Sequence, residues 1–442
     1  MPWEFMPALR LGIPPMARLL APSFRPPARF AARGAALYAT TLLLCITVTG
    51  AGLGLVTLQM AHRRLQRNLQ LSAQTSMALQ SGMDWTFWMV DSDPNWRTSV
   101  VSGQDYDLAS VGLDQVTMRL EDTDGNLADD DTDPAVLTVT SVTQIAASGG
   151  QAVCTRRLRL TAAPAPHRAL AFTVFSRDAV AFTGGVAVSG PVRAQGNITD
   201  DGTTALTAGA SFETVTGNTI SPGLQPVTFA SSAMASPAPD LAFYTNQATL
   251  LASSSGGNFD VRDAAFTSTS SSQGAANANG VYWIDAGGQE VRLENVYVKG
   301  TLVITNTRGS DINFERPCRL EQGTLGYPVL LADAATGRIE FAFASGERLD
   351  ETRANRDFNG DGDSADQVSP AISGLVWTRS ASVILGNSGW DFTGCIIGSN
   401  IQVTGGVQLK RDATIRSRVV PGFTDGRLHI VRGTIAEVAV EP

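Results

Sequence analysis

The longest uninterrupted apolar stretch of the chain runs from Ala35 to Met60 and contains no charged residue. As an α-helix it would be roughly 39 Å long, more than the ~30 Å hydrocarbon core of a bilayer. A cleaved secretory signal has an apolar region of only about 7–15 residues, followed by small residues. Here His62, Arg63 and Arg64 follow instead. Since the pattern shows no second apolar helix that could bury this one, it predicts a membrane-spanning helix.

The helical pattern continues beyond this segment. Residues 61–90 contain no proline and one glycine, and apolar side chains recur there at roughly helical spacing. Pro94 disfavours helix before it, so we expect one helix over residues 35–92 that ends at Asp91 to Pro94. Its exported half needs a partner for its apolar face, and the cluster of Trp85, Trp88 and Trp96 is expected to pack onto the next domain.

Beyond residue 98 apolar and polar positions alternate, which is typical of β-strands. The pattern predicts strands over 116–120, 136–140, 153–160 and 170–175, within a small β domain that covers 98–180. The loop after the first strand is either a solvated acidic hairpin loop or a weak calcium site, because hard cations prefer carboxylate and carbonyl oxygens. Its aspartates are Asp122, Asp124, Asp129, Asp130, Asp131 and Asp133.

Short apolar pulses separated by Gly, Asn, Ser and Asp turns fill residues 181–430. Such pulses suit the stacked rungs of a right-handed parallel β-helix, in which Val, Ile and Leu point inward; a β-sandwich is the alternative. Residues 199–280 are rich in Ser, Thr, Ala, Gly and Pro and are expected to form a long excursion or a partly disordered loop. The expected fold class is therefore mainly β, with a long N-terminal transmembrane helix, a small β domain and a large β-helix-like domain.

The charged residues indicate which partners the chain has and how it is oriented across the membrane. The 442 residues carry a net charge of −8, which argues against nucleic acid as a partner, because phosphate binding needs a basic face. Five arginines precede the apolar stretch and three follow it in the next seven residues. This bias predicts a cytoplasmic leader over residues 1–34, a single pass through an inner membrane, and a periplasmic or extracellular location for the rest. The arginines are Arg10, Arg18, Arg25, Arg29 and Arg33 before it, and Arg63, Arg64 and Arg67 after it.

Arg33-Gly34 directly before the apolar stretch, the long helix that continues outside it, and the segment 93–97 together resemble a type IV pilin-like protein. Residues 33–37, Arg-Gly-Ala-Ala-Leu, are similar to the N-terminal segment of PilX-type minor pilins. The resemblance implies that prepilin peptidase cuts after Gly34 and leaves Ala35 as a methylated N-terminus. Ala39 stands where most major pilins carry Glu.

The same resemblance implies other pilin-like subunits, or pilus and secretion assembly proteins, as partners. Gly50 and Gly54 form a GxxxG pair inside the apolar stretch, which would let such a helix approach closely; local flexibility is the other interpretation. The expected function is structural or binding, in type IV pilus assembly or in surface adhesion, with surface glycans as further candidate ligands.

One loop has the spacing of a calcium site. Asp357, Asn359 and Asp361 match positions one, three and five of an EF-hand-type loop, Gly362 permits the turn, and Asp363 would offer its carbonyl oxygen. Val368 stands where the bidentate Glu is expected, so Asp366 is the candidate replacement. Calcium is the one candidate cofactor, against an ordinary acidic turn.

Catalytic motifs are absent: the sequence has no HExxH, GxSxG, Walker loop or CxxC. We therefore expect no enzyme. The alternative is a membrane-anchored β-helical polysaccharide lyase or hydrolase, whose candidate carboxylates are Asp285, Glu290, Glu294 and Asp311. Three cysteines lie in the predicted exported part, and we expect either a Cys318–Cys395 disulfide or three small buried residues, Cys154 included.

Overall fold

The computed structural model describes residues 31–93, 95–109, 116–122, 124–128, 131–147, 150–207, 209–252, 258–358, 362–387 and 389–438. The predicted leader lies outside the described residues as far as residue 30. The chain divides into two compact units, residues 1–72 and 73–442. Of the described residues, those of the first unit belong to one helix, and those of the second are mainly in strands.

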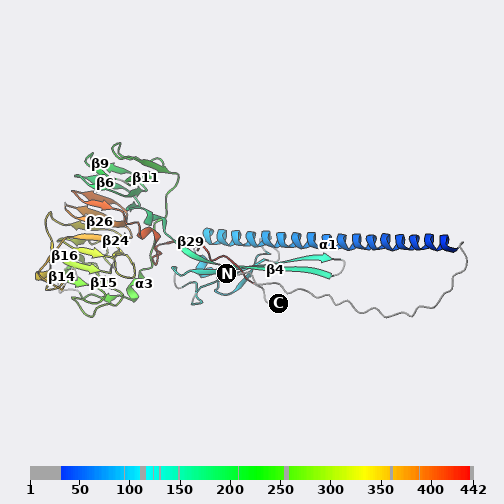
Figure 1. Ribbon diagram of the computed structural model, residues 1–442. Helices are drawn as coiled ribbons and strands as arrows, with labels where there is room; N and C mark the ends of the chain where they lie inside the picture. Colours follow the sequence, from blue (N-terminus) through cyan, green and yellow to red (C-terminus); the bar gives the residue numbers. More distant parts are fainter. Residues whose placement is uncertain are drawn as a thin grey trace. The chain divides into compact units, whose positions relative to one another are not determined.

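The helix α1 extends over Ala31–Ser92, 62 residues in all (Figure 1). It ends two residues before Pro94, as the sequence predicts, because the ring of a proline excludes helical conformation in the residue before it. Every side chain from Leu37 to Met60 is exposed. By length and composition, this is the one helix among the described residues that could cross a membrane.

In the second unit, α1 buries one stripe of its C-terminal part on an antiparallel sheet. The strands follow the order β1 (Asp105–Asp107), β2 (Val116–Glu121), β3 (Ala135–Ala147), β4 (Gly150–Pro166) and β29 (Thr424–Ile430), and β30 (Ala436–Val438) also pairs with β4. Leu79 and Val90 of α1 and Trp96 of α2 (Trp96–Ser99) share a buried cluster with the sheet. Of the three tryptophans expected to pack here, Trp96 is buried and Trp85 half-buried against the cluster, whereas Trp88 is 62% exposed.

The second sheet is a parallel coil of 22 described strands, which confirms the mainly β fold class with a large parallel sheet and excludes a β-sandwich. Each rung contributes to three columns of hydrogen-bonded strands, and the inward side chains form one continuous apolar core. The handedness of the coil stays a prediction.

The first column runs β13 (Thr249–Leu250), β15 (Val281–Asp285), β17 (Thr301–Thr305), β20 (Leu330–Ala332), β24 (Ala371–Thr378), β26 (Asp391–Gly398), β5 (Val174–Ser176), β8 (Pro191–Ala194), β11 (Ser211–Val215) and β12 (Val227–Ala230). The second runs β14 (Asn258–Phe266), β16 (Glu290–Lys299), β18 (Ile312–Phe314), β21 (Arg338–Ala342), β25 (Ser382–Gly386), β27 (Ile401–Thr404), β6 (Val180–Thr183) and β9 (Ile198–Asp200). The third joins parts of β14, β16, β24 and β26 to β19 (Arg319–Glu321), β28 (Gln408–Lys410), β7 (Ala187–Val188) and β10 (Ala205–Leu206).

The rungs do not stack in chain order. From β5 the chain coils to one end of the stack at β12, and residues 231–248, which include α3 (Leu241–Asn246), lead to the other end at β13 (Figure 1). From there the rungs build back until β26, β27 and β28 pair with β5, β6 and β7. The rung that comes last in the chain, formed by β26, β27 and β28, therefore lies in the middle of the stack.

Bent strands turn one corner of the coil at backbone positions that favour glycine. Gly374 in β24 and Gly394 in β26 are register partners with φ of +143° and +150°. A Cβ on Gly394 would lie 2.0 Å from the Gly374 carbonyl oxygen, so no larger residue fits there. Asn295 in β16 has a φ of +51° at a different corner, between the second and third columns, and its amide donates to Asp263 and to the Asp350 carbonyl.

Three expectations differ from the structure. Residues 170–175 form the end of a 3₁₀ turn, η2 (Arg168–Ala171), and the start of β5 rather than one strand. Residues 199–280 contribute β10 to β14 to the coil instead of forming a long excursion. The bounds 98–180 and 181–430 also differ from the sheets, because β5 belongs to the coil and β29 to the small sheet.

The expected Cys318–Cys395 disulfide is wrong: both thiols are free and buried in separate clusters. Cys318 points into the coil, whereas Cys395 lies on its outer side with Trp377 and Tyr244. Successive side chains of a strand point to opposite faces of the sheet. One cysteine lies at an inward position and the other at an outward position, so the two thiols cannot meet. Outside the two sheets lie β22 (Leu349–Asp350), α4 (Glu351–Ala354), β23 (Gln367–Val368) and η3 (Ile415–Ser417).

Candidate functional site

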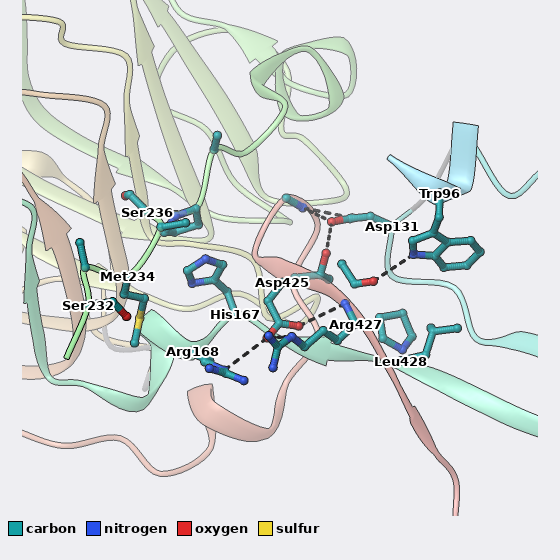
Figure 2. Close-up of a pocket in the computed structure, with 18 of the residues that line it drawn as sticks. Trp96, Asp131, His167, Arg168, Ser232, Met234, Ser236, Asp425, Arg427 and Leu428 are labelled. Carbon is teal, nitrogen blue, oxygen red and sulfur yellow. Dashed lines mark hydrogen bonds and ion pairs between the residues drawn. The ribbon is translucent and has the colours of Figure 1, made fainter. Parts of the chain in front are cut away.

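A pocket of about 610 Å³ lies in the second unit, where η2, β29 and the segment 230–238 come together (Figure 2). Its size is that of pockets that hold small molecules. The side chains that give it chemistry are four arginines, two aspartates and one histidine: Arg97, Arg168, Arg193, Arg427, Asp131, Asp425 and His167.

Contacts between residues far apart in the sequence build the walls. Asp131, from the acidic loop between β2 and β3, accepts hydrogen bonds from Gly422 N and Thr424 Oγ1, at 3.1 and 2.8 Å. The indole of Trp96, 1% exposed, donates to the Gly426 carbonyl oxygen at 2.9 Å. These bonds hold the start of β29 against α2 and the acidic loop.

The opposite wall is an irregular segment, residues 231–238, that three outward-facing side chains of the coil hold in place. Arg193 donates to the Ser232 carbonyl oxygen at 3.0 Å. The Gln195 amide bonds to both main-chain groups of Met234. Trp377 donates to the Pro237 carbonyl oxygen at 3.0 Å. The segment therefore has fixed ends, while Ser231 and Ser232 remain exposed.

His167 lies in the middle of the pocket, between the segment that carries Ser232, Met234 and Ser236 and the side chain of Asp425 (Figure 2). Its Nδ1 accepts a hydrogen bond from Ala169 N at 3.1 Å, which places the proton of the neutral ring on Nε2. Burial, and then the charge of Arg168, lower the pKa of His167 to about 4. At neutral pH the ring is therefore an uncharged hydrogen-bond donor.

The charged side chains of the pocket are held with unequal strength. Arg427 pairs with Asp91 at 2.6 Å, whereas Arg168 makes a 3.8 Å contact with Asp425 and is 60% exposed. Asp425 is 14% exposed, and burial raises the pKa of its carboxyl. Arg168 is thus the cation of this pocket that a ligand could engage at the lowest cost.

Arg193 forms the floor. Its guanidinium is 6% exposed, pairs with Glu213 of β11 and lies 5.9 Å from the ring centre of Phe172. Among the described residues, Arg193 Nε and the hydroxyl of Ser236 are buried without a hydrogen-bond partner. Buried polar groups without partners are uncommon in folded proteins, and these two atoms are too deeply covered to contact a ligand in the pocket.

The predicted calcium loop is described only in part, because Asn359 and Asp361 lie outside the described residues. Asp357 accepts from Gly362 N at 2.8 Å and Asp363 from Ala365 N at 2.9 Å, while the Asp366 carbonyl oxygen accepts from Glu351 N at 3.1 Å. Among the described residues, no group of three or more His, Cys, Asp or Glu is placed to hold a metal ion. The calcium site stays a prediction, and of the acidic loop at 122–133, Asp129 and Asp130 also lie outside the described residues.

The residues of the predicted processing and helix-packing sites all lie on α1. Gly34 and Ala35 are helical, and no atom lies within 4 Å of where a Cβ on Gly50 or Gly54 would be, so both glycines leave the helix surface open. Both roles stay predictions.

The carboxylates of the enzyme alternative each have a partner of their own. Glu290 pairs with Arg292 and Asp311 with Arg338, both at 2.9 Å. Glu294 lies near Arg262 and Arg316, and Asp285 accepts from the Asn306 amide. The hydrogen bond from Arg292 lowers the pKa of Glu290, which favours the charged form rather than a general acid.

The sequence did not reveal the pocket. Its residues come from six separate stretches of the chain, and in the sequence His167 is a lone histidine and Asp131 one member of an acidic loop. The one signal in the sequence was that this loop contains more aspartates than a turn requires. A pairing between residues 131 and 424 has no signature along the chain.

No family model and no curated protein matches the chain. Two solved structures do, each at 11% identity. The competence-associated pilin ComZ from Thermus thermophilus matches with a TM-score of 0.25, over 83% of this chain and 97% of that one. An ice-binding protein from the Antarctic ascomycete Antarctomyces psychrotrophicus matches with a TM-score of 0.23, over 55% and 95%. Likenesses with scores this low carry no inference about the present chain.

Proposed function

We propose that this chain is an exported structural or binding protein, anchored in the membrane by α1, and that it acts as a minor pilin-like subunit in type IV pilus assembly or surface adhesion. The observation that carries the proposal is the division of α1 into two parts. One part is apolar, uncharged and exposed from Leu37 to Met60, and the other buries a stripe of side chains on an antiparallel sheet.

The exposed part cannot remain in water. Burying one large apolar side chain is worth about 1.5–3 kcal/mol, and this stretch exposes twelve such residues, Tyr38 among them. A bilayer satisfies all of them at once, and the helix leaves no main-chain group unpaired inside it. The arginine bias supports a cytoplasmic N-terminus and an exported second unit.

The pilin-like part of the proposal rests on the Arg33-Gly34 border and on the fold of the chain just after it. A helix that contains this border, crosses the membrane and then packs on an antiparallel sheet suits a subunit whose membrane part packs into an assembly. Gly50 and Gly54 are the positions at which a second helix would come closest. If Gly50→Leu leaves every crosslinked partner of this segment unchanged, the glycines have no such role.

The mass of the N-terminal peptide, taken from protein in native membranes, tests the proposal. We expect a methylated peptide that starts at Ala35, and we expect Gly34→Leu to abolish it while Gly52→Leu does not. An intact leader in the unsubstituted chain would contradict the pilin-like role and leave a simple signal anchor.

The alternative, a β-helical lyase or hydrolase of polysaccharide, predicts a different result on a glycan panel. Cleavage creates new reducing ends, whereas a structural or binding protein creates none. We propose that none form. New reducing ends that disappear in Glu290→Gln would favour the enzyme.

A further inference from the structure

We propose that the pocket between η2, β29 and residues 231–238 binds a polyhydroxylated carboxylic acid, of the kind present as a uronic acid residue in acidic glycans. The proposal is independent of the pilin-like role, because it rests on the second unit alone. Two properties of the lining lead to it: its excess of cations, and its mixture of hydrogen-bond donors and acceptors.

The excess of cations is local. Four arginines and two aspartates line the pocket, whereas acidic residues outnumber basic ones, 41 to 33, over the whole chain. An anionic ligand is therefore drawn to this part of a surface that otherwise repels it. A guanidinium matches the two oxygens of a carboxylate, and Arg168 is the exposed, weakly paired guanidinium available for it.

The aspartates narrow the ligand class further. A compact anion such as inorganic phosphate offers few donors from which Asp425 could accept a hydrogen bond. Sugar hydroxyls, in contrast, donate to carboxylates and accept from N–H groups. Asp425 could accept from such a hydroxyl, while the neutral His167 ring could donate from Nε2.

The opposite wall suits hydroxyl groups as well. Ser231 and Ser232 are exposed on a segment that belongs to neither sheet, so their hydroxyls can contact a ligand. Apolar anchoring is weak by comparison: Trp96 lines the pocket but is 1% exposed, and the Arg97 guanidinium covers its ring at 4.9 Å. This favours a sugar acid over an acidic peptide, which would use apolar pockets for its side chains.

Isothermal titration of the full-length protein in detergent micelles tests the proposal with sodium glucuronate, glucose, inorganic phosphate and a tetra-aspartate peptide as probes. We expect glucuronate to bind at least about tenfold more tightly than glucose, since one lost charge-assisted hydrogen bond costs roughly that factor. We also expect it to bind more tightly than phosphate, which lacks the sugar hydroxyls. Arg168→Gln should remove this preference for glucuronate over glucose. The matched control is Arg338→Gln, an exposed arginine paired with Asp311 on the outer face of β21, and it should change nothing.

Several results would overturn the proposal. These are no heat with glucuronate at tens of millimolar, equal affinity for glucose, tighter binding of phosphate or of the peptide, or an unchanged preference in Arg168→Gln. The variant His167→Asn is a second test. Asparagine keeps the cap on Ala169 N but places no Nε2 donor in the pocket, so the affinity for glucuronate should fall severalfold. None of these results depends on whether Ala35 is the mature N-terminus.

Discussion

At the scale of single residues, His167 shows how a structural role and a chemical one coincide. Its Nδ1 caps η2 and its main-chain N–H donates to the Phe423 carbonyl oxygen at 2.7 Å, so the ring is fixed in one tautomer. The same burial that fixes the ring excludes a charge from it. Arg168, Arg193, Asp131 and Asp425 line the same pocket, and Arg168 adds repulsion to any proton that His167 would take up.

Stability should therefore depend on pH through His167. The folded pKa of about 4 is below the unfolded value of 6.5, so between these values the unfolded chain binds more protons, and the free energy of unfolding falls as pH drops. The loss should be fully absent above pH 6.5 and reach about 3 kcal/mol at most near pH 4. Urea unfolding at pH 7 and pH 4.5 measures it.

The control for this prediction is His167→Asn, which keeps the cap and cannot titrate. Asp425 has a raised pKa and acts in the opposite direction, but it is present in both proteins and cancels in the comparison. If the two proteins lose the same stability between pH 7 and pH 4.5, the ring is not buried in its neutral form.

At the scale of elements, the hydrophobic pattern predicted more than the polar residues did. The 3.6-residue period gave α1 and its end. The period of two gave β2 close to its observed bounds, but only part of β3 and β4, which extend over 13 and 17 residues. The pattern could not predict that β29 pairs with β4. Any strand with alternating apolar and polar residues could pair with the same edge of β4. Nor could it separate Asp131, which bonds to Gly422 and Thr424, from the neighbouring acidic residues of its loop.

The two faces of α1 in the second unit should respond differently to the loss of side chains. Leu79 is 6% exposed within the cluster formed with the small sheet, whereas Met77, two residues before it, is 71% exposed. Leu79→Ala should lower the free energy of unfolding by about 2–4 kcal/mol, because it leaves a cavity. Met77→Ala should change it by no more than about 0.5 kcal/mol. Guanidinium unfolding of both variants decides the matter, and similar losses would mean that the helix does not pack on the sheet through this stripe.

At the scale of the whole molecule, the order of the rungs sets how the coil responds to damage. Apolar pulses predicted a β-helix because each rung must bury its inward side chains on two neighbours. They could not predict that β26 pairs with β5, since the inward Val, Ile and Phe positions of one rung fit those of any other. This pairing joins the rungs from β13 to β28 to those from β5 to β12, so the stack depends on a contact between its two sequence halves.

A cavity at this junction should therefore destabilise more rungs of the coil than the same cavity at an end. Phe392 of β26 is 0% exposed at the junction, and Phe212 of β11 is 1% exposed in the rung next to the edge strand β12. Each Phe→Ala change should cost about 3–5 kcal/mol locally. In a stack with nearest-neighbour coupling, an end rung can fray alone, whereas a weak middle rung uncouples what lies on both sides of it.

Amide hydrogen exchange under native conditions distinguishes the two outcomes. We expect Phe392→Ala to accelerate exchange in β24 and β26 and also in β5 and β8, which are distant in sequence but adjacent in the stack. We expect Phe212→Ala to accelerate exchange only in β8, β11 and β12. Acceleration in Phe392→Ala that stops at β24, with β5 and β8 unaffected, would show that the two halves are stable independently and that their pairing contributes little to the coil.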